Sequence, residues 1–152
     1  MDHNRARLGG DDDAWDRAVS ALKDWKMFDV GWARLLPPGR PIEVGTTIAV
    51  LARHYGLRSL NPCRIVYLVH EDDGPVRRRG FAYGTLPGHA QGGEERFTVE
   101  QHGDGSVFYD LYAFSRPNDP LARYGRPFAR ALQQRFARDS LQAMVRATGT
   151  RH

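Results

Sequence analysis

The sequence predicts an α+β fold in which a curved antiparallel β-sheet grips a long C-terminal helix, with a short helix near the N-terminus. Three observations support this prediction. Segments rich in β-branched and aromatic residues follow one another through the middle of the chain. Short turns containing Gly, Pro and Asp separate them, and such short connections favour antiparallel neighbours. The last third of the chain has apolar residues at helical spacing.

Length and composition are those of one globular domain: 152 residues, of which 41% are hydrophobic and 26% charged. We expect residues 1–13 to be a disordered leader, because they are polar and rich in charge. Residues 14–147 then form a single domain, and residues 148–152 a flexible tail.

The cellular location is predicted from what the sequence lacks. It has no apolar run long enough to span a membrane, and its first residues lack the apolar stretch of a secretory signal. Its single cysteine, Cys63, cannot form an internal disulfide. A lone thiol suits a reducing compartment, so we expect the protein in the cytoplasm.

The first helix is expected over residues 14–27, where Trp15, Val19 and Leu22 recur on one face. The acidic residues 11–13 precede it and can cap its first turn. Strands are expected at 46–52, 64–70, 80–86, 95–101 and 107–115, with a further short strand near 28–36.

The final helix is expected to begin at Asp119 and Pro120, a capping residue followed by one suited to the first helical turn. Arginine and glutamine cover one of its faces. The opposite face carries Phe128, Leu132, Phe136, Ser140, Ala143 and Met144. This face can cover a curved sheet and leave a cavity between the two layers.

The formal net charge is +4, and Lys23 and Lys26 are the only lysines. The densest cationic run is the three arginines at 77–79, preceded by the acidic residues 71–73. We interpret this run as the solvated end of a hairpin; the alternative is a phosphate-binding patch. A nucleic-acid-binding protein gathers its cations on one face, so we expect no nucleic-acid partner.

Metal-binding and cofactor-binding motifs are not found in the sequence. His54, His70, His89 and His102 are scattered, and no pair has ligand spacing beside a carboxylate or thiolate. There is no Gly-rich phosphate loop and no nucleophile elbow. We therefore predict no metal and no organic cofactor.

Residues 80–100 carry the groups best suited to acid–base chemistry. The candidate catalytic residues are His89, Glu95 and Tyr83, with His or Glu moving protons and the Tyr hydroxyl holding an oxyanion. The alternative is that the acidic residues form an exposed ion network with Arg96 and that the histidine only occupies a loop.

Candidate ligand-binding residues come from neighbouring segments: Arg64, Tyr67, Tyr109, Trp32 and Phe97. A buried Tyr needs a partner for its hydroxyl. The tyrosines therefore either form the polar lining of a pocket or are satisfied core residues, and Trp32 is placed to close one end of a cavity.

Several segments resemble the family named domain of unknown function nineteen-ninety. They are Asn61–Tyr67 (NPCRIVY), Gly80–His89 (GFAYGTLPGH), Gly93–Phe97 (GEERF) and Val107–Pro117 (VFYDLYAFSRP). The Arg-rich final helix is also similar, and the resemblance covers roughly residues 25–147, leaving the leader unmatched. Members of that family occur in bacteria and plants and have no established general activity.

The resemblance implies a more distant likeness to helix-grip domains of the START and birch-pollen-allergen type. Those domains fold a curved sheet around a C-terminal helix and hold hydrophobic ligands between them, and some of that wider group are polyketide cyclases or dehydratases. Fold likeness alone does not assign a function.

Three functions follow as hypotheses. The first is binding of a small hydrophobic molecule in an enclosed pocket between sheet and terminal helix. The second is a cofactor-free acid–base enzyme, such as a cyclase, dehydratase or isomerase, using the same pocket. The third is a protein-interaction module with a solid core.

Overall fold

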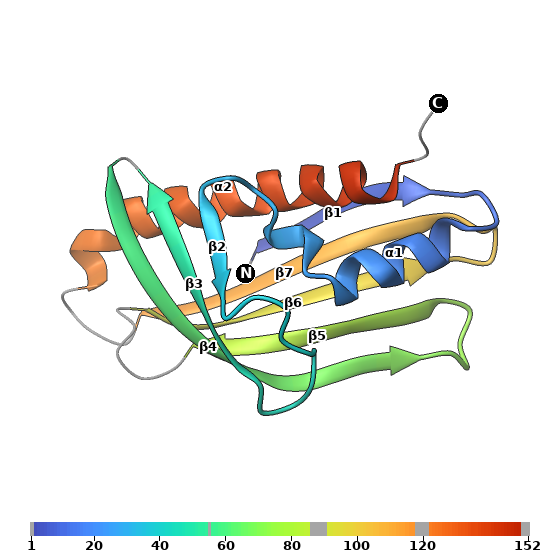
Figure 1. Cartoon of the computed structure of the whole chain (residues 1–152), viewed down its shortest axis with the longest axis horizontal. Helices are drawn as coiled ribbons and strands as arrows, with labels where there is room; N and C mark the ends of the chain where they lie inside the picture. Colours follow the sequence, from blue (N-terminus) through green and yellow to red (C-terminus); the bar gives the residue numbers. More distant parts are fainter. Residues whose placement is uncertain (1, 55, 86–90, 118–121, 150–152) are drawn as a thin grey trace.

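The computed structural model describes residues 2–54, 56–85, 91–117 and 122–149. Within them the strands form one antiparallel sheet of seven strands in the order β1-β7-β6-β5-β4-β3-β2, and the long helix α2 lies across it (Figure 1). The elements are β1 (Asp2–Gly9), α1 (Ala14–Lys23), the 3-10 helix η1 (Lys26–Phe28), β2 (Ala33–Leu36), β3 (Thr47–His54), β4 (Leu57–Glu71), β5 (Arg77–Thr85), β6 (Gln91–Gln101), β7 (Val107–Pro117) and α2 (Ala122–Thr148). The predicted fold class, a curved sheet gripping a C-terminal helix, is confirmed.

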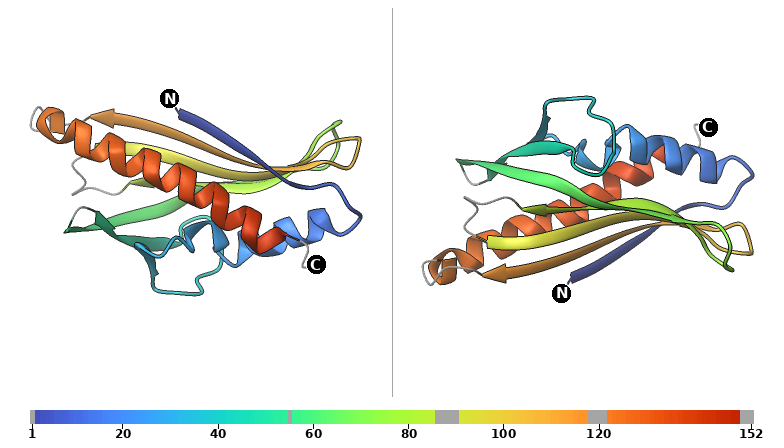
Figure 2. Two further views of the ribbon diagram at one scale, coloured as in Figure 1. Left: turned by 90° about the horizontal axis from the view of Figure 1, so that it is seen from above. Right: turned by 90° about the horizontal axis from the view of Figure 1, so that it is seen from below.

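From β2 to β7 each strand pairs with the next one along the chain, as short connections between strands require. The sheet curls so that β1 and β7 run along one side of α2, with β2 and β3 on the other side (Figure 2). Side chains alternate between the two faces of each strand. The inner face, toward the helices, carries Phe81, Tyr83 and Phe97, while Ala82 and Arg96 point to the outer face.

An aromatic cluster fills the middle of the space between sheet and helices. Phe28 packs against Phe97 and Phe136, with ring centroids 5.6 and 5.1 Å apart. Phe81 stacks on Phe97, and Trp25 meets Phe81 edge-on. Phe136 is the contribution of α2 and is only 9% exposed. Aromatic rings of this size occupy much of the interior that a cavity under α2 would need.

The first helix is shorter than predicted. α1 ends at Lys23, and Trp25 takes a left-handed conformation with φ of 57°, which turns the chain into η1. The Trp25 side chain is buried and its indole N–H donates a hydrogen bond to the carbonyl oxygen of Arg40, at 2.8 Å. At the other end the Asp13 side chain makes no capping hydrogen bond, and Asp11 instead pairs with Arg17 through two contacts of 2.9 and 2.7 Å.

Residues 2–9 form strand β1, where we expected a disordered leader. β1 pairs with β7 in antiparallel register, from Asp2 opposite Ala113 to Gly9 opposite Val107. The composition of this segment predicted disorder because it does not distinguish the two faces of the strand. Leu8 is buried with the core, whereas His3 and Arg5 point outward. The flexible tail was predicted to begin at residue 148, but Thr148 is the last residue of α2. It is 1% exposed, and its carbonyl oxygen accepts a hydrogen bond from Arg17.

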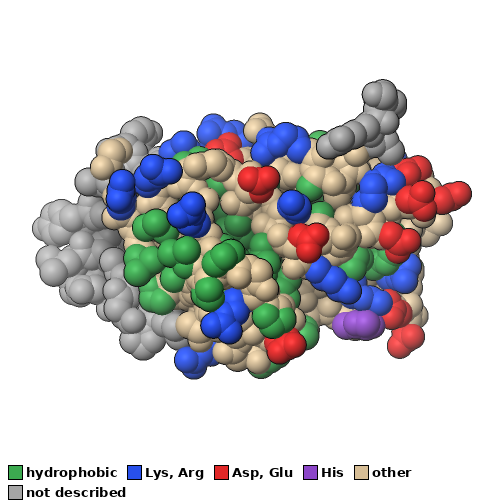
Figure 3. Space-filling model, in the orientation of Figure 1, with side chains coloured by type: hydrophobic (Ala, Val, Ile, Leu, Met, Phe, Trp, Pro, Cys, Tyr) green, Lys and Arg blue, Asp and Glu red, His purple; other side chains and the backbone are tan. Residues whose placement is uncertain are grey.

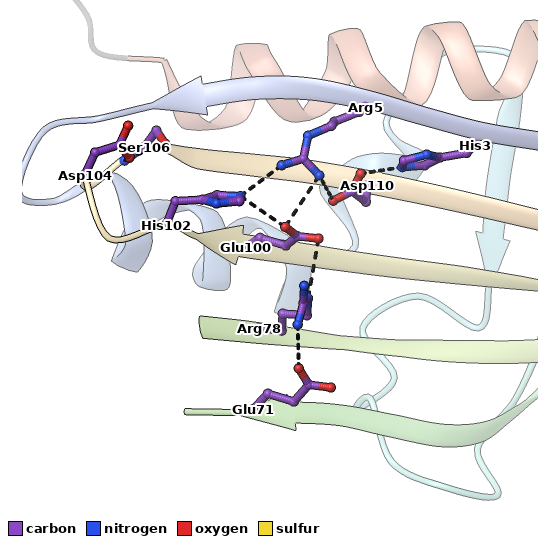
Figure 4. Close-up of polar contacts among 9 residues, drawn as sticks. All are labelled: His3, Arg5, Glu71, Arg78, Glu100, His102, Asp104, Ser106 and Asp110. Carbon is purple, nitrogen blue, oxygen red and sulfur yellow. Dashed lines mark hydrogen bonds and ion pairs between the residues drawn. The ribbon is translucent and has the colours of Figure 1, made fainter. Parts of the chain in front are cut away.

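Outward-pointing charges tie β1 to the rest of the sheet (Figure 4). The carboxylate of Asp110, on β7, contacts His3 Nε2 and Arg5 Nη1, each at 2.7 Å. Glu100, on β6, contacts His102 at 3.2 Å and Arg5 and Arg78 at 3.5 Å. Asp110 is fully buried. Although burial acts to raise it, the hydrogen bonds to the carboxylate and the charge of Arg5 hold the pKa of Asp110 below its usual range.

The arginine run at 77–79 lies at a hairpin end, as predicted, and is paired. Arg78 contacts Glu71 and Arg79 contacts Asp72, both at 2.7 Å, while Arg77 lies over the ring of Trp15. On the face shown in Figure 3, Lys and Arg side chains are dispersed among acidic ones. The expectation that nucleic acid is not a partner stays a prediction.

Candidate functional site

A hollow of about 190 Å³ lies between the sheet and α2. Its lining comes from β1, from β6 and β7, and from one stretch of the helix. The described lining residues are His3 and Asn4; Glu95, Leu111 and Ala113; and Gln133, Gln134, Phe136, Ala137 and Arg138. The lining is mixed, because three amide side chains and a carboxyl group adjoin aliphatic and aromatic surface.

Glu95 is the unusual member of this lining, because its carboxyl group lies on the inner face of the sheet. The alternation of β6 places it there together with Phe97 and Val99, which are both fully buried. Burial raises the pKa of Glu95 to about 7, while a hydrogen bond from the Tyr83 hydroxyl opposes the rise. The carboxyl group therefore titrates close to neutral pH.

Tyr83 and Glu95 are partners in the antiparallel register of β5 and β6, so their side chains stand side by side on the inner face. Burial first, and the charge of Glu95 second, raise the pKa of Tyr83 well above its ordinary value. The phenol therefore stays protonated and can donate to the carboxylate. This pair forms the polar end of the hollow.

Two further polar side chains extend this group toward the core. Cys63, on β4, is 2% exposed, and burial raises the pKa of its thiol to about 12, so it is not a nucleophile at neutral pH. Tyr109, on β7, is fully buried, and its hydroxyl is 2.9 Å from Ser140 Oγ on α2. Burial also raises the pKa of Tyr109. The Cys63 thiol donates instead to the carbonyl oxygen of Asn61, at 3.6 Å, and the Tyr109 hydroxyl is satisfied by Ser140.

Of the residues predicted from the sequence, the structure brings together Glu95, Tyr83 and Tyr109 on three adjacent strands. Phe97 lies beside them but belongs to the aromatic core. Trp32 packs against Phe136 and donates its indole N–H to Asp139 on α2, at 2.8 Å. It therefore joins the segment just before β2 to the helix.

Two predicted residues lie elsewhere. Arg64 is exposed, is opposite Gly84 on the outer face, and donates to Thr47 Oγ1 at 3.4 Å. Tyr67 is opposite the outward-pointing Ala82, because β4 has a bulge between Ile65 and Tyr67 that changes its alternation. His89 lies outside the described residues.

The sequence analysis missed the contributions of β1 and α2 to the site. Asn4 lies in a segment that we expected to be disordered, and Gln133 and Gln134 lie near the polar side of the predicted helix. Ser140 was identifiable, because a hydroxyl in an otherwise apolar helical face needs a buried partner. Its partner, Tyr109, could only be found once the strand order was known.

Metal chemistry finds no support among the residues that the structure describes. No group of three His, Cys, Asp or Glu side chains there is arranged to hold an ion. The expectation that the protein needs no cofactor stays a prediction. In the same part of the chain, no helix is both long and apolar enough to cross a membrane.

Comparisons with known proteins place the chain among relatives of unassigned activity. A family model described as Domain of unknown function (DUF1990) matches residues 1–143. A UPF0548 protein from Deinococcus radiodurans is 41% identical, over 96% of this chain and 77% of the relative. UPF0548 proteins from Dictyostelium discoideum and Arabidopsis thaliana are 36% and 32% identical, over 99% and 96% of this chain and 73% and 72% of theirs.

A solved structure shares the fold at low sequence identity. A hypothetical protein from Helicobacter pylori is similar with a TM-score of 0.63 and 12% identity, over 96% of this chain and 86% of that one. A major latex-like protein from Panax ginseng is 13% identical with a TM-score of 0.46, over 90% and 91%. The match over nearly the whole sequence and the three relatives above 30% identity agree. The chain belongs to the family described as Domain of unknown function (DUF1990).

Proposed function

We propose that the protein binds a small molecule in the hollow between the sheet and α2, with the Glu95–Tyr83 pair as its polar end. The observation that carries this proposal is the half-buried Glu95, whose carboxyl group lies on the inner face of the sheet and lines the hollow. Burying a carboxyl group costs free energy unless it is paired, and its neighbours on the inner face of the strand are apolar core residues. Function rather than stability is the simplest reason to keep it.

The size of the hollow limits the ligand. Drug-sized ligands occupy pockets of roughly 300–1,000 Å³, whereas this hollow measures about 190 Å³. An apolar cavity of roughly 150 Å³ holds one benzene molecule. The described hollow therefore suits a molecule of about one ring with a short polar arm.

Filling the hollow tests the proposal. Ala137 lines it from α2 and is 6% exposed, so Ala137→Phe places a ring inside it. The matched control is Val145→Phe on the same helix, because Val145 is 43% exposed and adds its ring to solvent. We expect ligands found by NMR with a library of single-ring compounds to bind the wild type and the control, and to bind the folded Ala137→Phe variant at least tenfold more weakly. Equal binding by both variants would contradict the proposal.

A second candidate function is cofactor-free acid–base catalysis in the same hollow, and the pKa of about 7 for Glu95 favours it. A general acid or base works best when its pKa is near the working pH. Cyclisation, dehydration and isomerisation are the reaction classes that need only such a group. Glu95→Gln should then abolish turnover while a substrate still binds, and the rate of the wild type should titrate near pH 7. A pH-independent rate would exclude this role.

A further inference from the structure

One charged side chain in the described lining of the hollow has no partner of opposite charge. Arg138 is exposed on α2, and its guanidinium Nε lies 3.2 Å from Asp139 Oδ1. His3 is paired with Asp110, which also binds Arg5, on the outer side of the sheet (Figure 4). Among the charged or titratable side chains that line the hollow in the described part of the chain, Glu95 alone lacks a partner of opposite charge. Its one polar contact there is the neutral Tyr83 hydroxyl.

The other lining groups also suit a positive charge. Asn4, Gln133 and Gln134 each carry a carbonyl oxygen that accepts hydrogen bonds. The ring of Phe136 lines the same space and offers an apolar surface to the rest of such a molecule. A buried carboxylate is best compensated by a cation that reaches it with hydrogen-bond geometry. Arg138 and His3, the other charged or titratable side chains in the described lining, are already engaged with Asp139 and Asp110.

We propose that the ligand of this site is a small amine that binds as a cation, its ammonium group against the Glu95 carboxylate and its apolar body against Phe136 and Leu111. The inference rests on the proposed binding function and adds the charge of the ligand to it. The volume of about 190 Å³ limits the amine to roughly one ring with a short arm. Tyr83 holds the carboxylate in place through its hydroxyl and can donate to it whether or not the amine is bound.

Binding of the amine should depend on pH through Glu95. Tyr83 on β5, Cys63 on β4 and Tyr109 on β7 face this carboxyl group, and all three keep their protons at neutral pH because burial raises their pKa values. Below about pH 7 the Glu95 carboxyl group takes up a proton, which must be released before the amine binds as an ion pair. The affinity for a permanently protonated amine should therefore fall about tenfold for each pH unit below this value.

The experiment compares benzylamine with benzyl alcohol, which has nearly the same shape and no charge. Each is titrated into the wild type, Glu95→Gln and Glu94→Gln, and the dissociation constant is measured by NMR at pH 8 and pH 6. Glu94 is the matched control, because it is the next residue on the same strand and points to the outer face. We expect the wild type and Glu94→Gln to bind benzylamine at least tenfold more tightly than benzyl alcohol at pH 8, with the preference reduced at pH 6.

Glu95→Gln should lose this preference and bind both compounds with similar, weak affinity. Equal affinity of the wild type for the two compounds, or a preference that survives in Glu95→Gln, would overturn the amine assignment while leaving small-molecule binding intact. Absence of binding by benzylamine and by every compound of the single-ring library would reject the proposed function and this inference together. Chemical shift changes confined to the outer face would also overturn the assignment, because the amine would then bind elsewhere.

Discussion

Tyr83 and Glu95 stand directly opposite each other on β5 and β6, and the phenol donates a hydrogen bond to the carboxylate inside the protein. The hydrogen bond acts against burial, which disfavours the ionised carboxylate. Burial and this hydrogen bond therefore act in opposite directions on the pKa of Glu95, which lies at about 7. Each can be removed separately by a substitution that keeps the shape of the side chain.

Tyr83→Phe removes the hydroxyl and should raise the pKa of Glu95 further above about 7. A hydrogen bond to a charged group contributes about 1.5–3 kcal/mol, which corresponds to a rise of roughly one to two pKa units. Titration of the Glu side-chain carbons by ¹³C NMR measures this directly. Tyr109→Phe serves as control, because the Tyr109 hydroxyl is bonded to Ser140. An unchanged Glu95 titration in Tyr83→Phe would show that the hydrogen bond has no effect.

Glu95 should make the protein less stable as the pH rises. Its folded-state pKa of about 7 lies above the ordinary value of 4.5, so the folded chain binds the proton more tightly than the unfolded chain does. The stabilisation is present below about pH 4.5 and is lost as the pH rises through about 7. We expect Glu95→Gln to remove this dependence and to stabilise the protein by roughly 2–3 kcal/mol at pH 9. Urea unfolding across this pH range, with Glu94→Gln as control, tests the sign; a stabilisation confined to acid pH would contradict it.

Phe136 should contribute much of the packing energy between α2 and the sheet. It contacts the rings of Phe28, Phe97 and Trp32 and is 9% exposed. Removing a buried Phe costs about 3–5 kcal/mol of unfolding free energy. Val145→Ala on the exposed side of α2 should leave the denaturation midpoint nearly unchanged. If Phe136→Ala were equally harmless, the packing of α2 described here would be wrong.

The Tyr109–Ser140 hydrogen bond is the buried polar link between β7 and α2, with its oxygens 2.9 Å apart. Tyr109→Phe and Ser140→Ala each leave the other hydroxyl without this partner, so each should destabilise the protein. The double variant should be less destabilised than the sum of the two, with a coupling of about 0.5–1.5 kcal/mol. Chemical denaturation of the wild type, the two single variants and the double variant measures this coupling. Strict additivity would mean that the two hydroxyls do not interact.

Asp110→Asn should loosen β1. The substitution removes the buried carboxylate that binds both His3 and Arg5, and we expect a loss of about 2–3 kcal/mol, because Arg5 keeps Glu100 as a second partner. Asp72→Asn, at an exposed ion pair with Arg79, should have little effect. Hydrogen exchange of the β1 amides locates the loss. Faster exchange spread evenly over all strands would argue against a specific role for Asp110.

The sheet from β5 to β7 was predictable because its strands have strong alternation and turn residues between them. The same alternation placed Tyr83, Glu95 and Tyr109 together on the inner face, as the structure has them. The start of β4 was not predictable, because Asn61 and Pro62 are typical turn residues. In the structure the strand runs through both, and the Asn61 side-chain amide donates to the carbonyl oxygen of Val50 across the pair, at 3.1 Å.

The position of Tyr67 depended on a bulge, which shifts the alternation of a strand without a strong signal in the sequence. Strand β1 was missed for a different reason. Its partner β7 lies about a hundred residues away along the chain, and Arg5 and Asp110 meet only when both strands are in place. The local sequence pattern of β1 does not indicate this pairing, because the strand that stabilises it lies so far away along the chain.

That long separation also affects how the protein is made. The residues of β1 are synthesised before those of β7, their strand partner in the described sheet, which follow about 100 positions later along the chain. β1 cannot pair until β7 has been made, whereas each strand from β3 to β7 can pair with the strand made just before it. Closing so long a loop is slow compared with forming hairpins. The nascent chain therefore extends its sheet from the β2 edge through to β7, and β1 docks on β7 last.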